Sequence, residues 1–187
     1  IYDTLSAYNQ PIKTLPGVAD ILEGSVTVSH IKPLSMEDLL HREPVRTNIA
    51  SIRDFVSNKK ILITGAGGSI GSELARQKTG HSPSELILID RYENGLFDID
   101  LELTRAKGAA TKSYIRDVTD REGIDRLLET AKPDMVFHAA AHKHVPLMEN
   151  NPLEAIKNNV FGTRNIIELS IKHKVDHFVM ISTDKAV

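Results

Sequence analysis

From residue 59 to the end of the chain, short apolar runs alternate with longer amphipathic stretches. The short runs are rich in Val, Ile and Leu, which is typical of buried strands. The longer stretches repeat apolar residues every three or four positions and therefore predict helices. Alternating strands and helices predict a parallel sheet covered on both faces. The predicted strands are 60–64, 86–90, 113–117, 134–139 and 177–182, and the predicted helices are 70–79, 94–106, 120–131 and 152–173.

These elements define an α/β fold class, a Rossmann-type parallel sheet in the strand order 3-2-1-4-5. In such a sheet, ligands bind over the carboxyl ends of the strands, where the strand order reverses. The last helix is the longest, and its apolar spacing predicts one stripe that faces the sheet. The predicted stripe is Ile156, Val160, Thr163, Ile166 or Ile167, and Ser170.

The first 57 residues lack this alternation, and four prolines among them allow only short elements. We interpret residues 1–57 as a linker or the tail of a preceding domain. Residues 58–187 would form an incomplete NAD(P)-binding Rossmann domain with its substrate domain missing. The short elements predicted in the first part are a helix at 18–22, a strand at 25–31, a helix start at 35–40 and a helix at 49–55.

A glycine-rich turn joins the first strand of the sheet to the following helix. Glycines there permit a sharp turn, close approach of a pyrophosphate to the backbone, and close packing of the helix on the sheet. The N–H groups at the start of the helix would face the phosphates. Such a turn alone is weak support, because it can simply connect two elements. The predicted phosphate-binding residues are Gly65, Gly67, Gly68, Ser69, Ile70 and Gly71.

The second strand ends in Asp90, which lies 19 positions after Gly71. A carboxylate about 20 residues beyond the glycine turn is the group that binds the adenosine ribose. Asp90 would pair with a 2′-hydroxyl and repel a 2′-phosphate, whereas Arg91 could accommodate that phosphate. We therefore expect NAD as the cofactor and keep NADP as the alternative.

Further candidate residues follow the later strands. Asp117 and Val118 could contact adenine, although an aspartate there could equally cap a turn or a helix. The small residues Ala139, Ala140 and Ala141 would let a flat cofactor lie against the backbone, or they could serve helix packing. Asn159 could orient a nearby loop or pack within its helix.

A basic loop follows these alanines. Lys143, His144 and Val145 are candidate substrate-binding residues, because loop cations beside a nucleotide pocket contact phosphates or sugar hydroxyls. With His138 and His142, His144 makes three imidazoles within seven positions. We expect no metal there, because neither a His-Glu-x-x-His helix nor a cysteine accompanies them.

The last predicted strand ends in Ser182-Thr183-Asp184-Lys185. An acid and a base beside a nicotinamide could transfer protons, if burial and mutual interaction tune them. Taken alone, a solvated ion pair at the end of a strand explains these residues equally well.

Four segments resemble the CapD-like polysaccharide-biosynthesis proteins, nucleotide-sugar 4,6-dehydratases of the extended short-chain dehydrogenase/reductase superfamily. The resemblance runs from about residue 35 to the end, and the segments occur in the family's order. They are 64–74, 139–149, 157–163 and 182–187.

The resemblance implies an NAD(P)-dependent lyase that converts a UDP-N-acetylhexosamine to a 4-keto-6-deoxy sugar for capsule, O-antigen or glycan synthesis. It implies that Thr183 binds the C4 hydroxyl, Asp184 is the acid at C6 and Lys185 is the base at C5. The alternatives are a nucleotide-sugar 4-epimerase or reductase and a non-catalytic dinucleotide-binding module. As given, the chain is expected to bind cofactor but to be inactive.

Composition narrows the remaining functions. The net charge of −2 gives no reason to expect nucleic acid as a partner. The chain has no cysteine, which fits a cytoplasmic location, and no apolar run long enough to span a membrane. Because it starts at Ile1 and ends directly after a strand, we read it as a fragment. The family's membrane helices would lie in preceding regions and place this domain at the cytoplasmic face of the inner membrane, and a homo-oligomer is compatible with the sequence.

Overall fold

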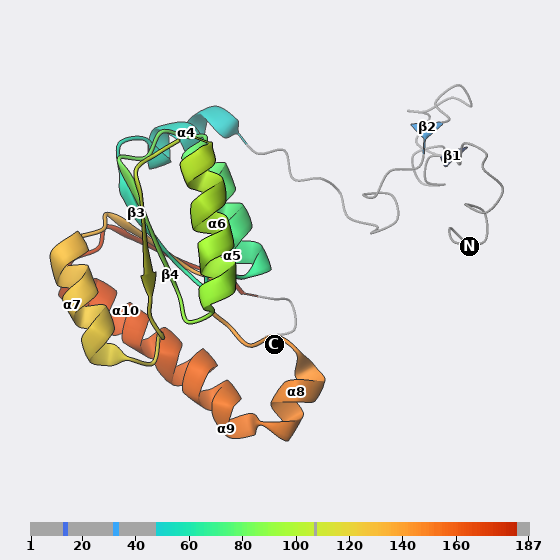
Figure 1. Cartoon of the computed structure of the whole chain (residues 1–187), viewed down its shortest axis with the longest axis vertical. Helices are drawn as coiled ribbons and strands as arrows, with labels where there is room; N and C mark the ends of the chain where they lie inside the picture. The colour runs from blue at the N-terminus through green and yellow to red at the C-terminus, as the bar shows by residue number, and fades with distance from the viewer. Residues whose placement is uncertain (1–12, 15–31, 34–47, 107, 183–187) are drawn as a thin grey trace, which may run out of the picture. The chain divides into compact units, whose positions relative to one another are not determined.

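A computed structural model describes residues 13–14, 32–33, 48–106 and 108–182 (Figure 1). The chain divides into two compact units, residues 1–47 and residues 48–187. In the first unit, β1 (Lys13–Thr14) pairs antiparallel with β2 (Lys32–Pro33). The interpretation of residues 1–57 as a linker or tail stays a prediction. The elements predicted at 18–22, 25–31 and 35–40 lie outside the described residues.

The second unit is built on a five-stranded parallel sheet. Its order is β5-β4-β3-β6-β7, which confirms the predicted order 3-2-1-4-5. The three central strands carry continuous apolar runs because both of their faces are covered. The strands are β3 (Lys60–Thr64), β4 (Glu85–Asp90), β5 (Thr111–Ile115), β6 (Met135–His138) and β7 (His177–Met180).

Helices cover both faces of this sheet and form two separate cores (Figure 1). Apolar residues of α4, α5 and α6 pack with Ile61 and Ile63 on one face. Apolar residues of α7 and α10 pack with Leu62 and Val136 on the other. The helices are α4 (Ile49–Val56), which was predicted at 49–55, α5 (Ser69–Thr79), α6 (Glu93–Arg105), α7 (Arg121–Ala131) and α10 (Thr163–Lys172).

The third strand ends earlier than predicted. It stops at Ile115 rather than at residue 117. The carboxylate of Asp117 accepts hydrogen bonds from the N–H group (2.9 Å) and the hydroxyl (2.8 Å) of Thr119. This local turn competes with strand geometry and places Asp117 in a loop above the sheet.

The region before α10 differs most from the prediction. An additional helix, α8 (Val145–Asn150), precedes α9 (Pro152–Ala155), and a π-helical segment, η2 (Ile156–Gly162), joins α9 to α10. A π-helix has i→i+5 hydrogen bonds and therefore departs from the α-helical period. None of the described helices combines the length and the apolar character needed to cross a bilayer.

This change of period corrects the predicted buried stripe. Ile156 and Val160 are not buried, since they are 45% and 55% exposed. Asn158 and Gly162 face inward in their place, and a Cβ at Gly162 would lie only 2.7 Å from the Val118 side chain. Beyond the π-helical segment the prediction is confirmed for Ile166 and Ser170, which are buried, whereas Ile167 is exposed and Thr163 is half-buried.

Candidate nucleotide-binding site

The glycine turn between β3 and α5 forms one wall of the site. Gly65 adopts a left-handed backbone (φ +68°), and a Cβ there would lie 2.6 Å from the carbonyl oxygen of Ala139. Gly68 is the N-cap of α5 and has no side chain to bond the N–H groups of the first turn. Those N–H groups have no partners within the helix, so the turn offers donors and a favourable helix dipole to an anion.

Asp90 fastens this turn to the end of β4. Its carboxylate accepts hydrogen bonds from the N–H groups of Gly67 and Tyr92, each at 2.9 Å. One bond goes to each carboxylate oxygen, and a carboxylate has about four acceptor positions. Asp90 can therefore hold the turn and still accept hydrogen bonds from a ligand.

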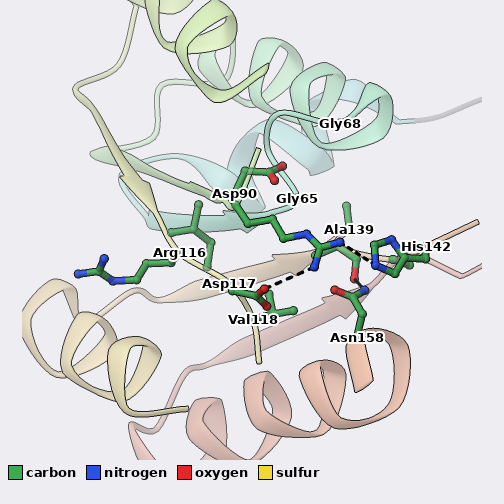
Figure 2. Close-up of a pocket in the computed structure, with 13 residues that line it drawn as sticks. Gly65, Gly68, Asp90, Arg116, Asp117, Val118, Ala139, His142 and Asn158 are labelled. Atoms are coloured by element: carbon green, nitrogen blue, oxygen red, sulfur yellow. Dashed lines mark hydrogen bonds and ion pairs between the residues drawn. The ribbon is translucent and has the colours of Figure 1, made fainter. Parts of the chain in front are cut away.

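A cleft opens over the carboxyl ends of β3, β4, β5 and β6 (Figure 2). Its volume is about 140 Å³, below the roughly 300–1,000 Å³ of complete small-molecule pockets. We therefore expect the cleft to be one part of a larger site rather than a complete pocket. The lining residues are Gly65, Gly68, Ile89, Asp90, Arg91, Arg116, Asp117, Val118, Ala139, Ala140, Ala141, His142 and Asn158.

Arg91 bridges two residues of this cleft. One of its guanidinium nitrogens lies 3.4 Å from Asp117, and another lies 2.8 Å from Nε2 of His142. Figure 2 shows both interactions as dashed lines. Burial opposes ionisation of Asp117, but the hydrogen bonds from Thr119 and the charge of Arg91 prevail and lower its pKa. Burial and the charge of Arg91 lower the pKa of His142, which fits a neutral ring that accepts a hydrogen bond from Arg91.

Two asparagines of η2 hold the loop that follows β6. The amide of Asn159 accepts a hydrogen bond from the N–H group of His142 (2.8 Å) and donates one to its carbonyl (2.9 Å). Asn158 donates hydrogen bonds to the carbonyl of Ala140 (3.3 Å) and to Asn159 (2.9 Å). The side chain of Asn159 is thus engaged with the loop, and it is Asn158 that lines the cleft. A direct contact of Asn159 with cofactor stays a prediction.

His138 connects three elements beneath the cleft. Its Nδ1 lies 2.7 Å from the hydroxyl of Thr64 at the end of β3, and its Nε2 lies 2.9 Å from the hydroxyl of Thr163 on α10. The Thr64 hydroxyl also accepts a hydrogen bond from the N–H group of Ala139 (3.3 Å), so it links the ring to the start of the loop that follows β6. Burial lowers the pKa of His138 to about 4, so the ring is neutral near pH 7.

The structure brings together most of the predicted cofactor residues. Gly65, Gly68, Asp90 and Arg91 line the cleft, as do Asp117, Val118 and the three alanines at 139–141. Gly67, Ser69, Ile70 and Gly71 lie in the adjoining turn and the first turn of α5. Lys143, His144 and Val145 are exposed where the same loop enters α8. Thr183, Asp184 and Lys185 lie outside the described residues.

Four lining residues were missing from the predicted site: Ile89, Arg116, His142 and Asn158. Ile89 and Arg116 each precede a predicted residue at a strand end, and that position was the available signal. His142 follows the predicted Ala141 and Asn158 precedes the predicted Asn159, so the same signal was available for both. Within the part of the chain that the structure describes, no group of three or more His, Cys, Asp or Glu side chains could hold a metal ion.

Comparison with known sequences identifies close relatives. The chain is 46% identical to the capsular polysaccharide biosynthesis protein CapD of Staphylococcus aureus, over 92% of this chain and 29% of that protein. It is 44% identical to the probable polysaccharide biosynthesis protein EpsC of Bacillus subtilis, over 94% of this chain and 30% of EpsC. The chain thus spans less than a third of these two relatives. A UDP-N-acetylglucosamine 4,6-dehydratase (inverting) of Campylobacter jejuni is 34% identical over 70% of this chain and 38% of the enzyme.

Solved structures share the fold. The structure of Pen from Bacillus thuringiensis has a TM-score of 0.66 and 32% identity, over 71% of this chain and 40% of that one. The UDP-Glc/GlcNAc 4-epimerase of Campylobacter jejuni has a TM-score of 0.63 and 32% identity, over 67% of this chain and 37% of the epimerase. The enzyme WbmG of Bordetella bronchiseptica, solved with NAD, has a TM-score of 0.58 and 26% identity, over 68% of this chain and 38% of WbmG.

The sequence resemblance, the sheet order and the strand-end cleft thus lead to one group of proteins. Its relatives include nucleotide-sugar dehydratases and epimerases with the same Rossmann-type fold. The family model for polysaccharide biosynthesis proteins matches residues 61–187. This chain therefore belongs to the polysaccharide biosynthesis protein family.

Proposed function

We propose that the whole protein is an NAD-dependent UDP-N-acetylhexosamine 4,6-dehydratase and that this chain supplies its dinucleotide-binding part. The observation that carries the cofactor assignment is the hydrogen bond between the Gly67 N–H group and the Asp90 carboxylate. It joins the phosphate-binding turn and the ribose-binding acid into one preformed unit at the switch point of the sheet.

Each part of such a cofactor would have its own partners among the described residues. The turn at Gly65–Gly68 and the start of α5 would receive the pyrophosphate, because the N–H groups of the first turn of α5 have no side-chain cap. Asp90 would bind the ribose hydroxyls. Asp117 and Val118 would border the adenine, and the alanines after β6 would leave room for the rest of the nucleotide.

The position of Arg91 supports NAD over NADP. Its guanidinium already pairs with Asp117 and His142. Binding a 2′-phosphate would require Arg91 to leave these partners, while the Asp90 carboxylate would repel the same phosphate. Both residues therefore favour a free 2′-hydroxyl.

The catalytic roles rest on the resemblance of Thr183, Asp184 and Lys185 to the family motif. A bound nicotinamide would supply the hydride acceptor for C4 of the sugar and the later donor of that hydride to C6. Thr183 would hydrogen-bond the C4 oxygen, whose hydroxyl proton would leave to solvent as the ketone forms. Lys185 would take the proton at C5, which the C4 ketone acidifies, and Asp184 would protonate the departing C6 hydroxyl as water. Lys185 would return a proton to C5 when the hydride adds to C6. An adjacent acid and base suit an elimination that needs one proton removed and one delivered.

A 4-epimerase is the second candidate, favoured by the likeness to the Campylobacter jejuni 4-epimerase. The two reactions differ at C5 and C6. A dehydratase removes the C5 proton and loses the C6 hydroxyl, whereas a 4-epimerase changes only C4. Incubating the full-length protein with UDP-N-acetylglucosamine in D₂O separates them: the dehydratase yields a 4-keto-6-deoxy sugar with deuterium at C5. A C4 epimer that keeps its C6 hydroxyl would contradict our proposal.

The non-catalytic alternative is tested by variants of the full-length protein. We expect Asp184→Asn and Lys185→Ala to lower turnover by at least about 100-fold, in line with the contribution of general acid–base catalysis. Binding of NAD should stay unchanged in both variants. Absence of any turnover in the parent protein, with NAD binding intact, would favour a pure binding module.

Calorimetric titration of this chain with NAD and NADP tests the cofactor assignment. NAD should bind more tightly than NADP, and Gly68→Val should abolish binding because its side chain would cover the phosphate-binding N–H groups. Asp90→Ala should weaken NAD binding and remove the preference. The control Gly80→Ala adds a methyl group at the end of α5, where it meets no atom closer than 3.4 Å, and should bind as the parent does. Tighter binding of NADP would refute the assignment.

A further inference from the structure

A contact between Arg91 and His142 spans the cleft. Arg91 directly follows β4 and His142 lies in the loop after β6, and the sheet places β4 and β6 on either side of β3. The hydrogen bond between the Arg91 guanidinium and Nε2 of His142 (2.8 Å) therefore crosses over the carboxyl end of β3, where the glycine turn begins. Figure 2 shows it as a dashed line that ends at His142. The loop after β6 thus helps to determine where the charge of Arg91 lies.

The guanidinium of Arg91 is held at two points. A second nitrogen lies 3.4 Å from the carboxylate of Asp117, in the loop after β5. A planar guanidinium with different partners on two of its nitrogens cannot rotate without breaking one of the two contacts. The contact with His142 is the shorter one. Asp117 alone, at a distance longer than about 3.2 Å, would hold the guanidinium only weakly.

The acceptor that His142 offers is fixed in position by its loop. The side-chain amide of Asn159 bonds both the N–H group (2.8 Å) and the carbonyl (2.9 Å) of His142. Asn158 bonds the carbonyl of Ala140, two residues earlier in the same loop. Arginine carries only donors, so Nε2 of His142 accepts the hydrogen bond from Arg91. The loop after β6 therefore presents a preformed acceptor to the arginine at the end of β4.

This bridge lies beside the residue that would bind the adenosine ribose. In the proposed function Asp90 binds the 2′-hydroxyl, so a 2′-phosphate would lie beside Asp90 and within reach of an unrestrained Arg91 side chain. An arginine binds a phosphate through two parallel hydrogen bonds from its fork of N–H groups. The bridge engages two guanidinium nitrogens with Asp117 and His142 instead. His142 thereby keeps the Arg91 cation away from a 2′-phosphate.

Arg116, the other arginine among the residues that line the cleft, does not replace Arg91 in this respect. Its guanidinium donates a hydrogen bond to the carbonyl of Ile115 (2.9 Å). Figure 2 shows the Arg116 side chain pointing away from Asp90. Recognition of a 2′-phosphate would therefore depend on Arg91 and on the residues that hold it.

We propose that His142 is a specificity-determining residue, which selects NAD against NADP by holding Arg91 across the cleft. The inference rests on the proposed dinucleotide site and extends it. It assigns part of the cofactor preference to the loop after β6, 51 positions from Arg91. Without the acceptor at His142, Arg91 could turn to a 2′-phosphate, but Asp90 would still repel that phosphate. Loss of His142 should therefore weaken the preference for NAD without reversing it.

Calorimetric titration of the chain with NAD and NADP tests this role through the ratio of the two dissociation constants, NADP over NAD. His142→Phe keeps an aromatic ring but removes the acceptor, so the ratio should fall at least about 5-fold, as for the loss of one hydrogen bond. His142→Gln carries an amide oxygen that reaches the position of Nε2 and should retain the parent ratio. The control His81→Phe makes the same change in the turn after α5, outside the cleft lining, and should also retain it.

A double variant shows whether His142 acts through Arg91. Arg91→Ala removes the cation, so adding His142→Phe to it should change the ratio by less than about 2-fold. A parent-like ratio in His142→Phe, or the same fall with and without Arg91, would overturn the proposal and leave the cofactor assignment in place. An equal fall in His142→Phe and His142→Gln would assign the effect to the loop and likewise overturn it. Tighter binding of NADP by the parent chain would refute the cofactor assignment and this proposal together.

Discussion

At the scale of single residues, His138 makes the stability of the fold depend on pH. Its ring is buried between the hydroxyls of Thr64 and Thr163, and its pKa is lowered from 6.5 to about 4. The unfolded chain therefore binds a proton between these pH values that the folded chain does not bind. By linkage, this residue lowers the free energy of unfolding as the pH falls from 6.5 to 4, by up to about 3 kcal/mol.

Urea denaturation at pH 7 and at pH 4.5 measures this loss. The matched variant His138→Asn has no titratable ring, so its stability should be lower at pH 7 but should fall less on acidification. The carboxylates change the free energy of unfolding with pH equally in both proteins. The difference between the two pH dependences is therefore the contribution of His138. Equal pH dependences in the parent and the variant would show that His138 does not carry this sensitivity.

Asp90 shows how far sequence can locate a site at this scale. Asp90 ends an apolar strand and lies 19 residues beyond Gly71. These two features were enough to predict that it lies beside the glycine turn. The bridge from Arg91 to His142 was not predictable, because it joins side chains that are 51 positions apart. Local spacing locates residues at strand ends, but it does not determine which long side chains meet above them.

At the scale of elements, the clamp formed by Asn159 connects η2 to the loop after β6. Replacing Asn159 with Leu keeps the approximate volume of the side chain and leaves the N–H and C=O groups of His142 without this partner. We expect a loss of about 2 kcal/mol in the free energy of unfolding, as for polar groups left unsatisfied. Lys157→Ala, an exposed change on the same segment, should cost less than about 0.5 kcal/mol.

Hydrogen exchange at the amide of His142 distinguishes the clamp from a general packing defect. In Asn159→Leu this amide should exchange much faster, whereas amides in the central strands should change only as far as global stability does. Unchanged protection at His142 would mean that Asn159 does not hold the loop.

The same segment shows why element boundaries were less predictable than element order. The sheet order follows from the sequence of apolar runs, and the handedness of parallel crossovers leaves few alternatives. In the π-helical segment, Asn158 bonds the loop after β6 and Gly162 lies against Val118, and local sequence does not reveal such tertiary contacts. An α-helical period applied to residues 152–173 therefore placed Ile156 and Val160 on the wrong side.

At the scale of the whole molecule, we interpret the cleft as one half of the dinucleotide site that we propose. Its lining comes from the turn after β3 and the loops after β4, β5 and β6, which are the elements that would hold adenosine and pyrophosphate. Its volume of about 140 Å³ is too small for a complete pocket. The chain also spans only 37–40% of the solved structures that it resembles. The nicotinamide half would then be completed by parts of the fold that those structures contain beyond the matched region.

This division predicts that the chain does not distinguish NAD from ADP-ribose, which lacks the nicotinamide. Titration with each should give dissociation constants within about 3-fold, a difference of less than 1 kcal/mol. Nicotinamide mononucleotide, which carries only the other half, should not bind detectably, whereas Gly68→Val should abolish binding of both adenosine-containing ligands. In the full-length protein NAD should bind at least about 10-fold more tightly than ADP-ribose, because the completed pocket adds contacts to the nicotinamide. If this chain alone already preferred NAD by that factor, the nicotinamide subsite would lie within residues 1–187, and the cleft would be more than the adenosine half of the site.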